Sequence, residues 1–74
     1  MAAMLQLEAI GPRGEELAMA AGDATGIPTG FDPEFECATF DADSLEPEEL
    51  KTTVFEALGE LDPEWQSHLR VLDE

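Results

Sequence analysis

The fold is decided most clearly by residues 47–61, whose sequence is PEELKTTVFEALGEL. Apolar residues in this stretch recur at i, i+4, i+7, i+8 and i+11, which is the spacing of one buried helix face. Pro47 suits the first helical position, and Glu48 and Glu49 follow it at the positive end of the helix dipole. The stretch therefore predicts a helix over 47–61, with an apolar face made of Leu50, Val54, Ala57, Leu58 and Leu61.

The start of this helix has two candidate caps. With Glu46 as the cap, Leu45 and Leu50 are placed to pack on each other as a hydrophobic staple. Glu is not among the preferred capping residues, whereas Ser is, so Ser44 is the alternative boundary. Both starting points stay open at the level of the sequence.

Two segments before this helix have the patterns of strands, and a second helix lies between them. Residues 4–10 alternate, with Leu5, Leu7 and Ala9 on one face. Residues 35–40, FECATF, are rich in aromatic and small side chains, as strands are. Pro12 indicates a helix start and Gly22 a helix stop, so we expect a helix from residue 12 to about residue 21.

Residues 22–33 combine three glycines and two prolines with few apolar side chains. Such a composition is typical of loops. A loop of this length in so short a chain tends to be functional or mobile. We therefore predict a flexible loop over 22–33.

The C-terminal segment has two interpretations. Trp65, Leu69 and Leu72 have helical spacing, whereas Leu69 and Val71 alternate with polar neighbours as in an edge strand. A strand at 67–72 is favoured because a two-stranded sheet is weak. We thus predict an α/β fold, a small α+β sandwich-like domain of order β-α-β-α-β, with a three-stranded sheet, two helices on one face and right-handed parallel crossovers. The alternative is an α+β fold with a third, C-terminal helix.

Length and composition place the chain as one folded acidic domain spanning residues 1–74. It contains 43% hydrophobic residues, which is rich for a disordered acidic tail, and its formal net charge is −15. Phosphate recognition depends on Lys and Arg, and the chain has only three such residues. We expect no direct binding to nucleic acid or membrane. The single cysteine and the lack of a basic leader or a long apolar run favour a cytoplasmic location.

No segment carries a complete catalytic or metal-binding motif. Residues 41–46, DADSLE, resemble the start of a calcium loop, but Glu46 and Thr52 occupy the positions that require Gly and Glu. His68 is the only histidine and has no evident partner for acid–base chemistry. Cys37 stands in acidic surroundings, which disfavour a reactive thiolate. We expect a non-enzymatic protein without catalytic, cofactor-binding or metal-binding residues.

The negative charge is concentrated in one part of the chain. Residues 31–64 have twelve acids and one base, a net charge of −11, whereas residues 1–30 have a net charge of −3. If residues 32–36 are extended, their three acids project to one side. Trp65 is added as a contact candidate because Trp is frequent in interface hot spots, although a place in the small core is the stronger interpretation. The predicted partner-binding residues are Asp32, Glu34, Glu36, Asp41, Asp43, Glu46, Glu49, Glu56, Glu60 and Trp65.

These features favour a small acidic protein that docks on a basic protein surface. One form of this function is a nucleic-acid-mimicking inhibitor of a nucleic-acid-binding enzyme or complex. In size and acidity the chain resembles the anti-restriction and anti-CRISPR proteins of phages and plasmids, and this resemblance involves no motif. The alternatives are an ordinary cytoplasmic domain from an organism with an acidic, halophile-like proteome, and a subunit of a larger assembly. The sequence leaves the oligomeric state open.

Overall fold

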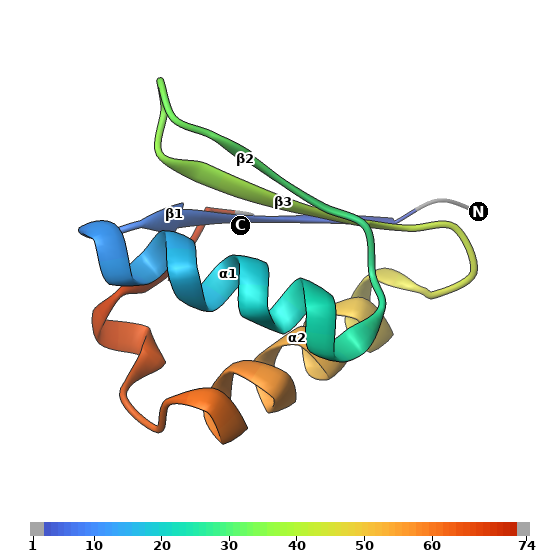
Figure 1. Ribbon diagram of the computed structural model, residues 1–74. Coiled ribbons are helices and arrows are strands. Elements are labelled where there is room, and N and C mark those ends of the chain that lie inside the picture. The colour runs from blue at the N-terminus through green and yellow to red at the C-terminus, as the bar shows by residue number, and fades with distance from the viewer. Residues whose placement is uncertain (1–2, 73–74) are drawn as a thin grey trace.

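Two helices cover one face of a four-stranded antiparallel sheet in the computed structural model, which describes residues 3–72 (Figure 1). The strand order is β2-β3-β1-β4. With its order of elements, this is the β-α-β-β-α-β arrangement known as the split βαβ or ferredoxin-like topology. The elements are β1 (Ala3–Ala9), α1 (Pro12–Thr25), β2 (Thr29–Asp32), β3 (Cys37–Ala42), α2 (Pro47–Leu61), a single 3₁₀ turn η1 (Trp65–Ser67) and β4 (Leu69–Val71).

The small α+β class and the two helices agree with the sequence prediction, but the number and direction of the strands do not. The segment 22–33, predicted as a loop, contains the last turn of α1, a three-residue connection and β2. Because β2 and β3 form a hairpin, the chain reverses direction once more than predicted. All three strand pairings are therefore antiparallel, and the expected parallel pairing of neighbouring strands is wrong. Each helix still joins two strands that run in the same direction, but another strand lies between them in the sheet.

Helix α1 continues past Gly22, which the sequence suggested as its stop. Gly22 lies inside the helix, where it packs against β2. A side chain at this position would collide with Thr29, which explains why the residue is glycine. The helix ends instead at Gly26, which has a left-handed φ of 75° and donates its N–H to the carbonyl of Gly22 at 2.9 Å. A left-handed residue just after the last turn is a common helix ending, and glycine adopts it without steric cost.

Helix α2 has the predicted bounds, and Glu46 is its N-cap. The backbone N–H of Glu46 donates to Oε1 of Glu49 at 3.3 Å, which satisfies one polar group at the helix start. The buried residues of α2 are Leu50, Val54 and Leu58. Leu61, predicted on the same face, is exposed because the helix ends there. No helix within residues 3–72 is long and apolar enough to cross a membrane.

The core lies between the helices and one face of the sheet. Alternate residues of β1 point into it, and Leu5 and Leu7 stand opposite Phe40 and Ala38 of β3. The strand predicted at 35–40 is found at 37–42, because residues 33–36 form the hairpin turn. The other face of the sheet is not covered by any element of residues 3–72 (Figure 1).

The C-terminal segment combines both of its interpretations. Trp65–Ser67 form one 3₁₀ turn, and the predicted strand is present as β4, which pairs with β1 through Ala9 and Leu69. A third full helix is therefore wrong. The 3₁₀ turn is short because Pro63 precedes it and the pairing of β4 with β1 begins at Leu69.

The hairpin turn provides a first prediction. Glu36 has φ +52°, a left-handed conformation that costs an L-residue roughly 1–2 kcal/mol. Glycine removes this cost at an entropic cost of roughly 0.5–1 kcal/mol. We expect Glu36→Gly to raise the free energy of unfolding by about 0.5 kcal/mol in urea titrations.

The matched control is Glu34→Gly, which removes the same charge from the same turn. Glu36 is the only non-glycine residue with positive φ in the described part of the chain. Glycine at position 34 therefore adds entropy to the unfolded chain without relieving strain, and we expect a loss of about 0.5 kcal/mol. Equal effects of the two substitutions would show that charge, and not backbone conformation, decides the stability of this turn.

Candidate functional site

The acidic residues predicted to bind a partner fall into three groups, two of which lie at opposite ends of β3 while the third follows α2. One group is the hairpin tip, residues 32–36, where the turn from β2 to β3 carries Asp32, Glu34 and Glu36. A second lies around the connection from β3 to α2 (Figure 1). The six residues of β3 separate these two groups by about 17 Å. The structure thus divides what the sequence suggested as one acidic segment.

The hairpin tip differs from its predicted form. Only Asp32 lies on a strand, and residues 33–36 form the turn, so the three acids do not line one side of an extended segment. The carboxylate of Asp32 accepts the backbone N–H of Glu34 at 2.9 Å. The backbone carbonyl of Glu36 accepts the N–H of Ala9 at 2.7 Å, which ties the turn to the end of β1. All three acidic side chains are exposed.

The second group we call the end cluster. It consists of Asp41, Asp43, Glu46 and Glu48, and all four are exposed. Asp41 lies on β3 and Asp43 in the following bend, while Glu46 caps α2. From the sequence, Glu48 was expected to complement the helix dipole and was not among the predicted contact residues. Its position two residues after the cap residue was the signal that could have added it.

The end cluster continues into a row of carboxylates along α2, which we call the α2 stripe: Glu49, Glu56 and Glu60. Residues seven and eleven positions apart on an α-helix lie within about 20° of the same direction. The stripe therefore occupies one flank of α2 over about 16 Å. All three side chains are exposed. Glu49 also accepts the N–H of Glu46, so it has a structural role that Glu56 and Glu60 lack.

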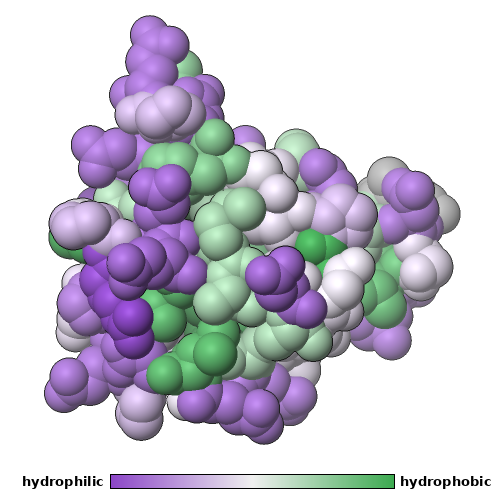
Figure 2. All heavy atoms as spheres, in the orientation of Figure 1, coloured by the Kyte–Doolittle hydropathy of each residue, from purple (hydrophilic) through white to green (hydrophobic). Residues whose placement is uncertain are grey.

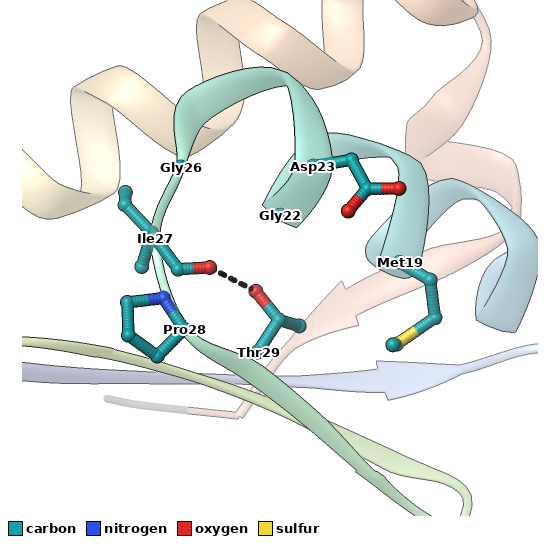
Figure 3. Close-up of a pocket in the computed structure, with 7 residues that line it drawn as sticks. All are labelled: Met19, Gly22, Asp23, Gly26, Ile27, Pro28 and Thr29. Atoms are coloured by element: carbon teal, nitrogen blue, oxygen red, sulfur yellow. Dashed lines mark hydrogen bonds between the residues drawn. The ribbon is translucent and has the colours of Figure 1, made fainter.

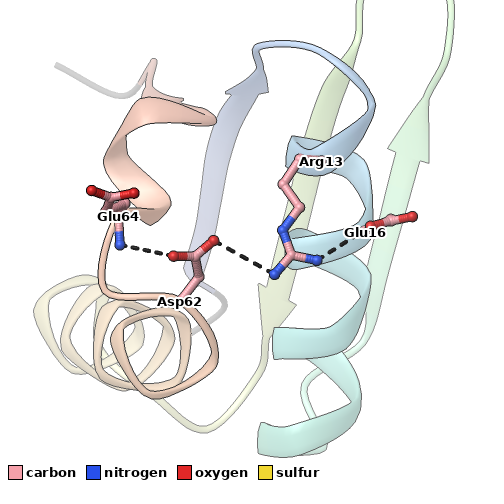
Figure 4. A network of polar contacts seen from close by, with 4 residues as sticks. All are labelled: Arg13, Glu16, Asp62 and Glu64. Carbon is pink, nitrogen blue, oxygen red and sulfur yellow. Dashed lines mark hydrogen bonds and ion pairs between the residues drawn. The ribbon is translucent and has the colours of Figure 1, made fainter.

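The ion pairs of residues 3–72 all involve Arg13 (Figure 4). Its guanidinium lies 3.3 Å from Oε1 of Glu16 and 3.5 Å from Oδ2 of Asp62. The other carboxylate oxygen of Asp62 accepts the N–H of Glu64 at 2.9 Å. Arg13 thus joins the start of α1 to the end of α2, and its role is structural. None of the nine predicted acidic contact residues has an ion pair within the described residues.

Trp65 lies in the core and not on the candidate surface. Its exposed fraction is 7%, and its ring stands 5.0 Å from that of Phe55 at an angle of 37°. This arrangement is a tilted aromatic contact of ordinary geometry. The interpretation of Trp65 as a core residue is therefore correct, and we leave it out of the docking surface.

The remaining candidates for chemistry lie apart from one another. Cys37 is half-buried at the start of β3, and His68 is half-buried before β4. The backbone carbonyl of His68 accepts the N–H of Ile10 at 2.7 Å, which makes the residue part of the sheet edge. Within residues 3–72, no group of three or more His, Cys, Asp or Glu side chains is placed to hold a metal ion.

Three shallow hollows lie near the end cluster. The first, of about 310 Å³, lies between the last turns of α1 and the start of β2, with Met19 and Asp23 on one side and Pro28 and Thr29 on the other (Figure 3). The second, of about 360 Å³, lies between residues 25–28 and 41–45. The third, of about 350 Å³, is lined by Leu45, Glu48, Glu49, Thr52 and Thr53.

These hollows give the acidic end of the molecule an uneven surface. Leu45 lies between the second and third hollows, and carboxylates stand at the rim of both. In the view of Figure 2, polar residues surround the molecule and a band of more apolar residues runs through its middle. The two hollows beside Leu45 offer carboxylates at the rim and apolar area for the stems of long basic side chains.

Comparison with known proteins adds no further support, because no protein-family model, curated protein or solved structure matches this chain.

Proposed function

We propose that the chain is a non-enzymatic acidic binding protein that docks on a basic surface of a protein partner. The observation that carries the proposal is the exposure of the end cluster and the α2 stripe without any neighbouring base in an ion pair. Arg13 is held between α1 and α2, and Lys51 and Arg70 make no ion pair within residues 3–72. The carboxylates of the two sets are therefore available to a partner.

The electrostatics favour this use of the surface. Like charges on one flank repel each other and destabilise the folded state, and no ion pair within residues 3–72 offsets that repulsion. Lys and Arg side chains of a partner would offset it. Each exposed pair contributes only about 0.2–1 kcal/mol, so a set of seven carboxylates acts mainly through its summed field. Such a field raises the association rate from about 10⁵–10⁶ to as much as 10⁸–10⁹ M⁻¹s⁻¹ at low salt.

The finer proposal is that the basic surface is one that otherwise binds nucleic acid. The three charges of the α2 stripe have a mean spacing of about 8 Å along the helix, whereas one strand of DNA carries one charge per 3.4 Å. The stripe is therefore too sparse to replace a strand of phosphates by itself. The end cluster adds four carboxylates at the N-terminal end of α2. Together the two sets present a row of charge that a phosphate-binding groove can accept.

A second candidate function is favoured by α1. That helix also exposes Glu15, Glu16 and Asp23, so acids occur on the outer side of both helices. Acids distributed over solvated surfaces are typical of proteins that work in concentrated salt. In this case the chain would need molar salt for full stability, because screening relieves the repulsion between carboxylates. Circular dichroism in low and molar sodium chloride separates the two proposals: a fold that is complete at low salt supports docking.

Charge reversal tests the docking proposal. We expect Glu56→Lys with Glu60→Lys to slow association with the partner by about tenfold or more at low salt, since both residues lie on the α2 stripe. These positions are chosen because neither side chain makes a hydrogen bond within the described residues. The wild type, immobilised, is used to capture a basic protein from a lysate of the source cells. The captured protein is then purified, and its binding is measured by surface plasmon resonance.

The matched control reverses two charges on the other helix, Glu15→Lys with Asp23→Lys. Both double variants have the same net charge, so a general loss of electrostatic attraction to the partner affects them equally. The proposal predicts a clearly larger effect for the α2 pair and release of the partner by double-stranded DNA. Equal effects of the two variants would contradict the proposal that the docking surface lies on α2. A partner that DNA does not displace would contradict nucleic-acid mimicry and leave docking on a basic surface intact.

A further inference from the structure

Phe35 is the most exposed large apolar side chain in residues 3–72, with an exposed fraction of 70%. The other three phenylalanines belong to the core: Phe40 is fully buried, and Phe31 and Phe55 pack against the core from its edge. Folding therefore uses every phenylalanine except the one at the hairpin tip. A single exposed apolar residue is common on protein surfaces, so its surroundings decide whether it has a role.

The hairpin tip holds Phe35 away from the body of the molecule. The turn projects beyond the helices and the rest of the sheet in Figures 1 and 2. It is held in place by the hydrogen bond from Glu34 N–H to the Asp32 carboxylate and by that from Ala9 N–H to the Glu36 carbonyl. A side chain presented on a fixed turn loses less conformational entropy when it binds than one on a mobile loop.

We propose that Phe35 is an apolar anchor that enters a pocket of the basic partner, and that the rim of this pocket carries Lys or Arg side chains. The inference rests on the proposed docking to a basic protein. Charge complementarity selects the occupant: the ring is flanked by Asp32, Glu34 and Glu36, and no base lies in the turn. An aromatic side chain enclosed by a pocket with satisfied charges at its rim is the usual form of an interface hot spot.

The distance between the two acidic groups agrees with a single partner. The hairpin tip and the end cluster are separated by about 17 Å along β3. A protein interface of standard size covers about 800 Å² on each partner, which is roughly 30 Å across. One basic partner can therefore contact both groups. Nucleic acid and anionic lipid are unsuitable occupants, because their phosphates would face the three carboxylates of the tip.

Truncation of the ring tests the anchor. We expect Phe35→Ala to weaken binding of the purified, captured partner by about 30-fold or more, measured by isothermal titration calorimetry. The matched control is Ile10→Ala, which truncates another exposed apolar side chain, 49% exposed and outside the tip, and is expected to change binding less than about twofold. A second measurement keeps the ring of Phe35 in place. With 4-fluorophenylalanine in the chain, the fluorine signal of Phe35 should shift on binding while that of Phe40 stays unchanged.

The outcomes distinguish this inference from the proposed function. If Phe35→Ala binds like the wild type while the α2 charge reversal weakens binding, the anchor is wrong and the docking proposal stands. If Phe35→Ala weakens binding and the α2 reversal does not, the tip is the interface and the α2 stripe is not. Capture of no basic protein contradicts both. Phe35-dependent binding to neutral phosphatidylcholine vesicles would replace the protein pocket by a lipid surface and overturn the inference.

Discussion

Replacing Phe40 by alanine is expected to lower the free energy of unfolding by about 4 kcal/mol, since removal of a buried phenyl ring costs about 3–5 kcal/mol. Phe40 is the largest of the fully buried side chains in the described part of the chain. It lies on β3 between two neighbouring strands, opposite Leu5 of β1 and Thr29 of β2. Loss of the ring therefore leaves a cavity where the sheet meets the helices.

A domain of 74 residues has a total stability of roughly 4–11 kcal/mol, so this loss removes much or all of it. We expect Phe40→Ala to be largely unfolded at 37 °C by circular dichroism. Urea titration at 10 °C measures the remaining stability. The matched control is Phe35→Ala, which makes the same chemical change at a side chain that is 70% exposed. Its expected effect is within about 0.5 kcal/mol. Similar losses at the two positions would contradict the assignment of Phe40 to the core.

The elements that the sequence predicted well are those whose pattern is local. Helix α2 repeats its apolar residues over four turns, and β1 alternates over its whole length, so burial on one face could be inferred from each segment alone. Strand β2 has only four residues, two of which, Gly30 and Phe31, show no pattern by themselves. It forms because Thr29 and Phe31 pair with β3, and such a non-local contact leaves no signature in a short segment.

The error in strand direction follows from that single missing strand. Without β2, each helix would connect two neighbouring strands, and neighbouring strands joined through a helix run parallel. With β2 in place, the crossover through α1 passes over β3, which then lies between β1 and β2 in the sheet. The prolines at 28 and 33 suggested a loop, but proline is accepted at the ends of an edge strand, where no partner requires its N–H.

The candidate site was predictable in composition but not in arrangement. Acidic residues are visible in the sequence, whereas the division into hairpin tip, end cluster and α2 stripe depends on the hairpin that was missed. The helical part of the site could be inferred, because Glu49, Glu56 and Glu60 follow from the period of a helix already predicted. Phe35 could not be, since its exposure results from a turn at residues that were expected to be a strand.

The second large effect is expected at Gly14, which lies in the first turns of α1 and is buried. A Cβ atom at this position would collide with the backbone carbonyl of His68 and stand only 2.9 Å from Cβ of Ala9. That carbonyl accepts the N–H of Ile10, so it is fixed by the sheet and cannot turn aside. Alanine should therefore force α1 away from β1 and the residue before β4, and we expect Gly14→Ala to cost about 3 kcal/mol, at the upper end of the range for overpacking.

Gly59 of α2 is the matched control, because it is also a helical glycine. A Cβ atom there meets only Nε1 of Trp65, at 4.0 Å, which is ordinary contact. Helix propensity then decides, and Gly59→Ala should stabilise the protein by roughly 0.5–1 kcal/mol. The same substitution thus has opposite signs in the two helices when both variants are titrated with urea. Stabilisation by both would mean that α1 can move away from the sheet without loss, and close packing at Gly14 would then not hold α1 in place.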